Sequence, residues 1–307
     1  MNLKLLFSLM FFITDCDKTL VHYENNNDIT NLLSLPSSSG SNKIGYVHLE
    51  TINLLNDISK NDKVDAIICC SGMRISTMLQ RYSYFPSISY WITENGGRIF
   101  EINNNNDGDN IKIPIEIIEW KELLLSDVDN FQKLILFQNY LKDNNWDVDG
   151  IIENNNNDIK NTNYSTMIRI KKNINDIDYK TIIPLIPPSL KYSLNLGYLD
   201  IYLPNSGKLS SSKWLMNYIR NKKKINNNNN NNNNKDKDRV GYFFMGDDDN
   251  DIECANDSDN AFIVNPCSES MKSFFINSNK KDKLIMSNEL YHKSSIHLLQ
   301  TIKYMIN

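Results

Sequence analysis

The feature that most constrains this chain is an apolar run, residues 11–13, that leads directly into Thr14-Asp15-Cys16-Asp17. A short run of bulky residues is typical of a strand that is buried on both faces of a parallel sheet. Because successive side chains on a strand point to opposite faces, Asp15 and Asp17 share one direction, with Cα atoms about 6.6 Å apart. Open α/β sheets bind ligands beyond the carboxyl ends of their strands. The run therefore indicates either a ligand site built on two carboxylates or a strand that ends in an Asx turn.

The bulk composition narrows the class of protein. A length of 307 residues is sufficient for two domains, and a net charge of -4 gives no general affinity for nucleic acid. The cysteine count of 5, with no CxxC spacing, favours free thiols and a reducing, cytoplasmic location. The apolar stretch at residues 5–13 lacks a signal-peptide cleavage site and is too short to span a bilayer. We expect a soluble protein without nucleic-acid or membrane partners.

Asparagine is concentrated in clusters, and the longest is the unbroken run at residues 226–234. Such tracts cannot bury apolar surface, so we predict that this run is disordered. Because insertions are tolerated in surface loops, the clusters mark connections between structural elements.

The order of the expected elements changes twice along the chain. Strands and helices alternate at first, which predicts a parallel, doubly wound (Rossmann-like) sheet. A polar loop is expected at residues 24–45, and the alternating elements lie at 11–14, 47–59, 64–70, 75–82 and 90–93. From residue 115 to residue 203, the pattern becomes helix–strand–strand, repeated once, with helices near 115–141 and 177–183. This predicts an α+β unit with an antiparallel sheet.

The alternating pattern resumes after Pro204, with a helix at 211–220, strands at 240–245 and 261–264, and a closing helix at 292–305. We therefore predict an α/β fold in which a discontinuous core, residues 1–114 and 204–307, carries an inserted α+β cap, residues 115–203. Hinges are expected near Pro114 and near residues 204–207, because the inserted unit enters and leaves the core there.

Polar residues also follow two other predicted strands. Ser71 and Gly72 end the strand at 64–70, where the serine is either a ligand contact or a helix N-cap. An acidic loop, residues 247–253, ends the strand at 240–245. Its ionised groups repel one another unless solvent or a cation relieves them, and hard divalent cations take carboxylate ligands. The loop is therefore either a metal site or an acidic surface.

A candidate lysine also lies at the start of the helix expected at 211–220. Lys213 lies in the first turns, where a cation is unfavourable beside the helix dipole unless an anion is near. A solvated surface lysine is the competing interpretation. Lys208 is a second candidate, and Lys213 is preferred because apolar helical spacing follows it.

Taken in order, these residues resemble the four motifs of the haloacid dehalogenase (HAD) superfamily of phosphatases. The motifs are Asp15-Cys16-Asp17-Lys18-Thr19, Ser71-Gly72-Met73-Arg74, Lys213 and Gly246-Asp247-x-x-Asn250-Asp251. The segment Thr93-Glu94-Asn95-Gly96-Gly97 is similar to one found in Cof-type and sucrose-phosphatase-like members. Those members carry an α+β cap between the second and third motifs, where this chain has its inserted unit. The resemblance covers essentially the whole chain outside the asparagine tracts.

The resemblance implies a Mg²⁺-dependent phosphatase of small phosphorylated metabolites, with sugar phosphates favoured. Asp15 would be the nucleophile that becomes an aspartyl-phosphate, and Asp17 the general acid. The residues that would bind the substrate phosphate are Ser71, Gly72, Lys213 and Asn250. The residues that would bind Mg²⁺ are Asp15, Asp17 through its backbone carbonyl, Asp247 and Asp251.

Two departures from the family pattern stand out. Lys18 replaces the glycine that is common after the second aspartate, and Trp214 follows Lys213 where the family often has glycine. A phosphotransferase or phosphomutase with the same intermediate, or a non-catalytic binding protein with this fold, are the alternative interpretations. The sequence identifies neither the substrate nor the oligomeric state.

Overall fold

The structure is a computed structural model that describes residues 10–23, 30–36, 43–104, 112–151, 164–171, 179–195, 197–226 and 241–307. Of the asparagine run predicted to be disordered, Asn226 is the last residue of a helix, and residues 227–234 lie outside the described residues. No helix in the described ranges is long and apolar enough to cross a membrane.

One large sheet dominates the fold. In the described part of the chain it has eight strands in the order β14-β13-β12-β1-β4-β5-β6-β7. The parallel strands are β14 (Leu284–Met286), β13 (Asn260–Ile263), β12 (Gly241–Gly246), β1 (Met10–Thr14), β4 (Val64–Cys70) and β5 (Tyr90–Thr93). Two antiparallel strands, β6 (Arg98–Asn104) and β7 (Lys112–Glu116), complete one edge. All of β1 is buried between β12 and β4, which confirms the prediction of a strand buried on both faces of a parallel sheet.

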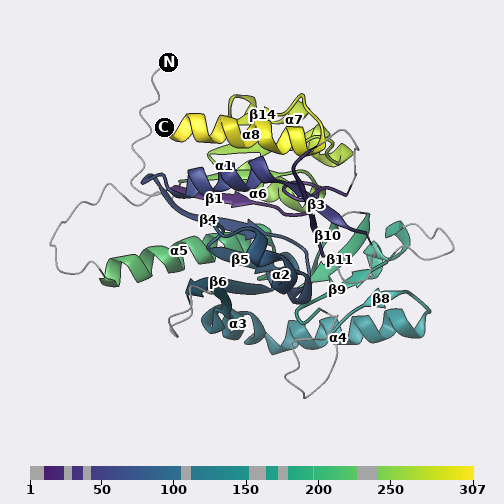
Figure 1. The fold of residues 1–307 in the computed structure, drawn as a ribbon. Coiled ribbons are helices and arrows are strands. Elements are labelled where there is room, and N and C mark those ends of the chain that lie inside the picture. Colours follow the sequence, from purple (N-terminus) through teal and green to yellow (C-terminus); the bar gives the residue numbers. More distant parts are fainter. Residues whose placement is uncertain are drawn as a thin grey trace.

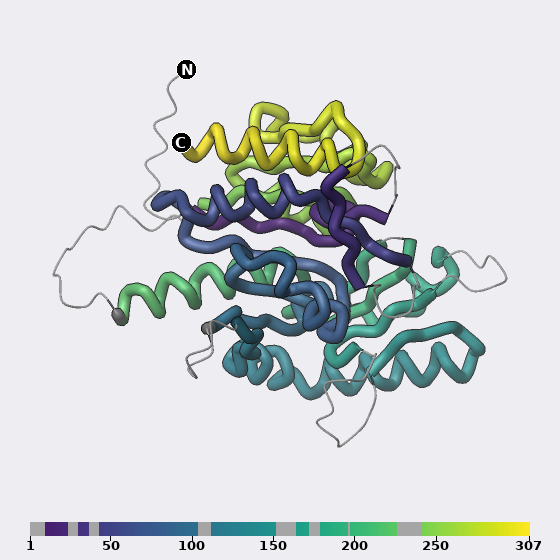
Figure 2. Tube along the Cα trace, in the orientation of Figure 1, coloured from purple at the N-terminus to yellow at the C-terminus, as the bar shows by residue number. Residues whose placement is uncertain are grey.

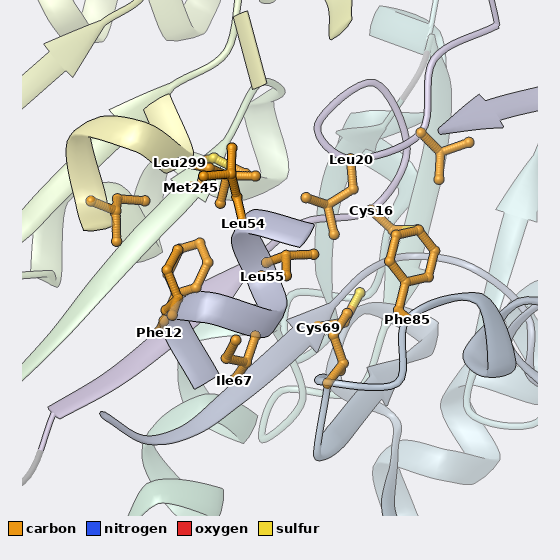
Figure 3. Packing of buried hydrophobic residues seen from close by; sticks show 14 of the residues in the cluster. Phe12, Cys16, Leu20, Leu54, Leu55, Ile67, Cys69, Phe85, Met245 and Leu299 are labelled. Carbon is orange, nitrogen blue, oxygen red and sulfur yellow. The ribbon is translucent and has the colours of Figure 1, made fainter. Parts of the chain in front are cut away.

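Helices cover both faces of this sheet. The helices α1 (Leu49–Ser59), α2 (Ile75–Arg81) and α8 (Tyr291–Ile306) pack on the face that Phe12 enters. Figure 3 shows this packing around Phe12, Leu55 and Leu299. The helices α5 (Lys208–Asn226), α6 (Ile252–Asp257) and α7 (Glu269–Asn277) pack on the face that Phe11 enters. Figure 1 shows α8 and α1 on one side of β1 and α5 on the other, so the doubly wound prediction is confirmed.

A second, antiparallel sheet belongs to the inserted segment. Among the described residues its strand order is β10-β11-β9-β8, with β8 (Val148–Asp149), β9 (Met167–Ile170), β10 (Lys191–Asn195) and β11 (Tyr198–Tyr202). The helix α4 (Val128–Asp143) packs on it through Leu134, Phe137 and Leu141. Figure 2 follows the chain from the large sheet into this teal segment and back into the green α5. The segment is the expected α+β cap.

The helix α3 (Ile118–Leu125) joins the two parts. Trp120 packs in the apolar cluster of the large sheet, whereas Leu124 packs in the apolar cluster of the cap. The predicted boundary between residues 114 and 115 falls inside β7, a strand of the large sheet. The boundaries given for the two domains therefore stay a prediction.

Three local expectations were wrong. The helix expected near residues 177–183 is, over its described part, two short 3₁₀ turns, because Pro184 lacks a backbone N–H donor and Pro187 follows closely. The helix expected at 115–141 is divided into α3 and α4, since Asp127 caps a new helix by accepting from the Asn130 backbone N–H. The polar loop expected at 24–45 contains β2 (Leu32–Leu35), which pairs with β3 (Gly45–His48).

Candidate active site

The carboxyl ends of β1, β4 and β12 bring three predicted residues to one edge of the sheet. Asp15, Ser71 and Asp247 each follow one of these neighbouring strands, and all three side chains are buried. Carboxylate oxygens of Asp15, Asp247 and Asp251 lie within 4.8 Å of one another. The parallel strand order explains this convergence, because parallel strands end at the same edge.

The lysine at this edge is Lys208, and the prediction that Lys213 lies there is wrong. The Lys208 ammonium donates to Asp15 Oδ1 at 2.9 Å and to Asp251 Oδ1 at 2.6 Å, and the residue is 4% exposed. The side chain of Lys213 is 49% exposed and pairs with Asp257 at 2.6 Å. Because α5 already begins at Lys208, a residue five positions later points about 140° away around the helix.

Asp251 fixes the acidic loop from inside. Its Oδ2 accepts from the backbone N–H groups of Asp247 at 3.1 Å and Asp248 at 3.2 Å, while its Oδ1 accepts from Lys208. Asp247 in turn accepts at 2.6 Å from the hydroxyl of Thr19. Both oxygens of Asp251 are therefore engaged in holding the loop and the lysine in place.

The pKa values of two of the clustered carboxyl groups are raised. Burial raises the pKa of Asp15 to about 7, with Lys208 opposing the shift and the charge of Asp251 adding to it. Burial also raises the pKa of Asp247 well above its ordinary value, with the charges of Asp15 and Asp251 adding to the shift. Close buried carboxylates of this kind are relieved by a divalent cation with oxygen ligands. The donor set therefore fits Mg²⁺.

Asp17 has different partners. Its Oδ1 accepts from Arg81 Nη1 at 2.7 Å and also from the hydroxyl of Tyr23, and Arg81 Nη2 donates to that hydroxyl at 3.2 Å. Burial pushes the pKa of Asp17 upward, but the Arg81 guanidinium and the Tyr23 hydrogen bond outweigh it, so the net shift is downward. Sequence reasoning missed both partners. The spacing of Thr77, Met78 and Arg81 on the buried face of α2 is a signal that could have identified the arginine.

The turn after Asp17 accounts for the departure at Lys18. Its φ of 61° lies in the left-handed region, which glycine adopts at little cost, and this explains why the family pattern favours glycine there. The Lys18 side chain is exposed, so its charge points away from the buried carboxylates.

The cap lies directly over the Ser71-Gly72 turn. The Ser71 hydroxyl accepts from the Met73 backbone N–H at 3.3 Å. A Cβ on Gly72 would lie 2.2 Å from Asn195 Nδ2 and 3.2 Å from Arg169 Nη2, and both of these residues belong to the cap sheet. The ends of two cap side chains are therefore packed directly against this turn, and a side chain at position 72 would have to displace them. Asn250, expected to contact substrate phosphate, donates to Asn95 Oδ1 at 3.0 Å.

No protein-family model and no curated protein matches the sequence, but solved structures match the fold. A sucrose-phosphatase from Synechocystis sp. PCC6803, solved with sucrose and phosphate, has a TM-score of 0.58 at 11% identity, over 97% of this chain and 98% of that one. A HAD-superfamily phosphatase from Bacteroides thetaiotaomicron has a TM-score of 0.55 at 12% identity, over 98% and 96% of the two chains. A HAD/COF-like hydrolase described as putative, from Plasmodium vivax, has a TM-score of 0.54 at 13% identity, over 97% and 96%. The chain therefore has the fold of the HAD-superfamily phosphatases that carry an α+β cap.

Proposed function

We propose that this protein is a Mg²⁺-dependent phosphatase that hydrolyses small phosphorylated metabolites through an aspartyl-phosphate on Asp15. The observation that carries this proposal is the buried ammonium of Lys208 between Asp15 and Asp251, with Asp247 beside them. Phosphoryl transfer depends mainly on positioning and on charge stabilisation, and this edge of the sheet supplies both.

The proposed reaction has two steps, and both take place at Asp15. One Asp15 oxygen attacks phosphorus as the ester P–O bond breaks, and a proton from Asp17 goes to the leaving oxygen. A water molecule then attacks the phosphorus of the aspartyl-phosphate, gives its proton to Asp17 and releases inorganic phosphate with Asp15 restored. Lys208 holds Asp15 in place and offsets charge on the phosphoryl oxygens.

Asp17 must leave Arg81 to act as an acid. In this structure its carboxyl is paired with the guanidinium, and the lowered pKa keeps it ionised. Rotation toward the leaving oxygen would break that pair and remove the charge that lowers the pKa of Asp17, so that the carboxylate could take a proton from solvent before it donates one to the leaving oxygen. The pair with Arg81 is thus a resting arrangement in this proposal.

The same edge of the sheet holds the groups that would bind the cation. Asp15, Asp247 and the backbone carbonyl of Asp17 would hold Mg²⁺, while Asp251 orients the loop rather than the metal, since both of its oxygens are occupied. When bound, the cation supplies positive charge beside the carboxylates and the phosphoryl oxygens. Ser71 and the backbone at Gly72 would bind the remaining phosphoryl oxygens.

Sugar phosphates are the favoured substrate class. The cap presents Arg169 and Asn195 to the site, and both are hydrogen-bonding side chains suited to hydroxyl-rich leaving groups. The likeness to a sucrose-phosphatase supports this choice. All five cysteines lie in described residues and are free, which supports a reducing, cytoplasmic location. We propose no nucleic-acid or membrane partner.

The test is release of inorganic phosphate by the purified full-length protein. A panel of phosphorylated sugars, with an aryl phosphate beside them, is incubated with Mg²⁺ and, in parallel, with EDTA. We expect hydrolysis of some members that requires Mg²⁺ and disappears in EDTA. Release of phosphate from none of them, or equal release in EDTA, would count against the proposed function. Transfer of the phosphoryl group to an added alcohol without hydrolysis would indicate a phosphotransferase instead.

A further inference from the structure

The turn at Glu94 and Asn95 has an unusual backbone conformation. Their φ angles are 54° and 50°, in the left-handed region, which is more costly for Glu94 than for Asn95 because asparagine enters it more readily than most residues, and both side chains are buried. Two such residues in succession persist only where the surroundings hold them. The contacts of this turn show what those surroundings are.

Asn95 hydrogen-bonds to the cap, to the acidic loop, to residues 206–207 and to Ser71, whose carbonyl accepts from the Asn95 backbone N–H at 3.3 Å. Its side-chain Nδ2 donates to Asp200 Oδ2 of the cap at 2.7 Å, and its Oδ1 accepts from Asn250 Nδ2 of the acidic loop at 3.0 Å. Its backbone carbonyl accepts from the Gly207 N–H at 2.7 Å and from the Ser206 hydroxyl at 3.0 Å. The two ends of one buried amide thus face the cap and the acidic loop.

Glu94 holds the cap from the same turn. Its Oε2 accepts from the backbone N–H and the hydroxyl of Ser165, each at 3.0 Å. The same oxygen accepts from the backbone N–H of Thr166 at 2.9 Å and from its hydroxyl at 2.7 Å. These residues lead directly into β9, so the turn is tied to the cap sheet at two places.

The third neighbour is the segment where the chain returns from the cap. A Cβ on Gly96 would lie 2.5 Å from the Gly207 carbonyl oxygen, so the two backbones are in direct contact. Gly207 precedes Lys208, and Asn250 precedes Asp251. The contacts of Asn95 therefore end one residue away from each member of the Lys208–Asp251 ion pair.

From Asp200 of the cap, the hydrogen bonds continue to the Ser71-Gly72 turn. Asp200 also accepts from Arg169 Nε and Nη2, each at 2.6 Å, and from Asn195 Nδ2 at 3.2 Å. Arg169 Nη2 in turn donates to the Gly72 carbonyl at 3.3 Å. One hydrogen-bonded network thus connects the cap, the Ser71-Gly72 turn, the acidic loop and the base of α5.

We infer that Asn95 is a positioning residue that couples the closed position of the cap to the placement of Lys208 and the acidic loop. When the cap lies on the core, Asp200 and Asn250 fix the two ends of the Asn95 amide, and its carbonyl fixes Gly207. When the cap lifts, Asp200 leaves, and the turn loses a contact that holds its strained backbone. The catalytic consequence of this coupling rests on the proposed function, whereas the coupling itself does not.

The first test needs no substrate and no metal. Hydrogen exchange is measured by mass spectrometry on the full-length protein in EDTA, for the wild type, Asn95→Ala and Trp120→Phe. Trp120 donates to the Gly96 carbonyl at 2.9 Å, so its variant disturbs the same turn from the α3 side. It is therefore the matched control.

We expect Asn95→Ala to raise exchange together in residues 165–170 of the cap and 247–251 of the acidic loop. Trp120→Phe should raise exchange only near the turn and α3. Exchange in Asn95→Ala that is confined to residues near 95 would overturn the inference, whether or not the protein hydrolyses any ester. Asn95→Asp tests the two ends of this side chain separately. It places a second carboxylate next to Asp200, but it can still accept the hydrogen bond from Asn250. Hydrogen exchange in this variant should therefore increase more in the cap than in the acidic loop.

The second test is kinetic and uses p-nitrophenyl phosphate with Mg²⁺. We expect Asn95→Ala to lower kcat by about 10–100-fold, the usual effect of losing a residue that orients the groups around a metal site, with a smaller change in KM. Trp120→Phe should keep the wild-type kcat. An active wild type in which Asn95→Ala matches Trp120→Phe in both kcat and exchange would overturn the inference. A wild type that hydrolyses nothing would count against the proposed function, and the exchange result then decides the coupling.

Discussion

Asp15 and Asp17 follow the same strand and are both buried, yet their pKa values are driven in opposite directions. Burial raises both. The carboxyl of Asp15 faces a second carboxyl, Asp251, as well as Lys208, and its pKa rises to about 7. The carboxyl of Asp17 faces Arg81 and the Tyr23 hydroxyl, and its pKa falls. The comparison teaches that, for two carboxyl groups that are both buried, the neighbours decide the direction in which each pKa is shifted.

The partners also differ in origin. Those of Asp15 come from α5 and from the loop after β12, whereas Tyr23 lies six residues from Asp17 and Arg81 lies on α2. The surroundings of Asp15 mix like and unlike charge and leave excess negative charge for a cation to offset. The surroundings of Asp17 are already neutralised. The surroundings of Asp15 therefore suit the binding of a cation, whereas those of Asp17 do not.

Replacing Asp15 by asparagine should have the largest effect. An amide matches the carboxylate in shape but is not a nucleophile, so we expect turnover to fall on the order of 10⁴–10⁶-fold. Phosphate release with Mg²⁺ is the measurement, and circular dichroism is the control for folding. More than trace activity in a correctly folded variant would contradict the nucleophile assignment.

Replacing Arg81 by methionine removes the cation that pairs with Asp17. The Asp17 carboxylate would stay buried without its cation, and we expect the free energy of unfolding to fall by roughly 3–5 kcal/mol. Tyr23→Phe removes only the hydrogen bond and should cost less, about 1.5–3 kcal/mol. Urea unfolding measures both. Adding Asp17→Asn to Arg81→Met should recover much of the loss, and a further loss instead would show that the ion pair is not the cause.

Lys208→Ala tests which lysine serves Asp15. We expect turnover to fall on the order of 10²–10³-fold, as when one preorganised charge or donor is removed from a site. Lys213→Ala is the matched control, since its side chain is on the surface of the same helix, and it should keep wild-type kinetics. The opposite ranking of the two variants would restore the interpretation based on the sequence.

The pH dependence of stability without metal tests the raised pKa of Asp15. In EDTA the folded protein keeps a proton on Asp15 up to about pH 7, whereas the unfolded chain releases it near the ordinary pKa of 3.8. The unfolded state therefore binds fewer protons between these values, and the free energy of unfolding should fall as the pH rises from about 4 to 7. Thermal unfolding across this range measures the slope. Asp15→Asn should reduce it, leaving the contribution of Asp247, and an unchanged slope would contradict the raised pKa of Asp15.

The sequence predicted best what a single strand and its end determine. Asp15, Asp17, Ser71 and Asp247 were identified because each follows a buried apolar run, and the order of these runs predicted a parallel sheet that brings the ends together. Lys213 was preferred to Lys208 because apolar helical spacing follows it in a helix expected at 211–220, whereas the helix begins earlier, at Lys208, after Gly207 with its φ of 114°. The expected helix start was therefore too late, and Lys213 rather than Lys208 was expected at the site.

Contacts between distant segments could not be predicted in the same way. Arg81 is fully buried against an aspartate 64 positions away, and an arginine in a helix is ordinarily a surface residue. The segment around Asn95 was recognised only as part of a resemblance. Its links to Asp200 and Asn250 depend on how the cap docks, which no local pattern encodes.

The position of β1 in the sheet has a consequence for how the chain is made. Its neighbour on one side is β4, but on the other side it is β12, so Met10 pairs with Gly241. During synthesis, β1 leaves the ribosome long before β12 has been made. Pairings between strands so far apart in the sequence also slow folding. Until then, one edge of the largely apolar strand β1 stays unpaired, and an unpaired apolar edge is a template for aggregation. Chains that terminate before β12 should therefore aggregate rather than fold into a smaller domain.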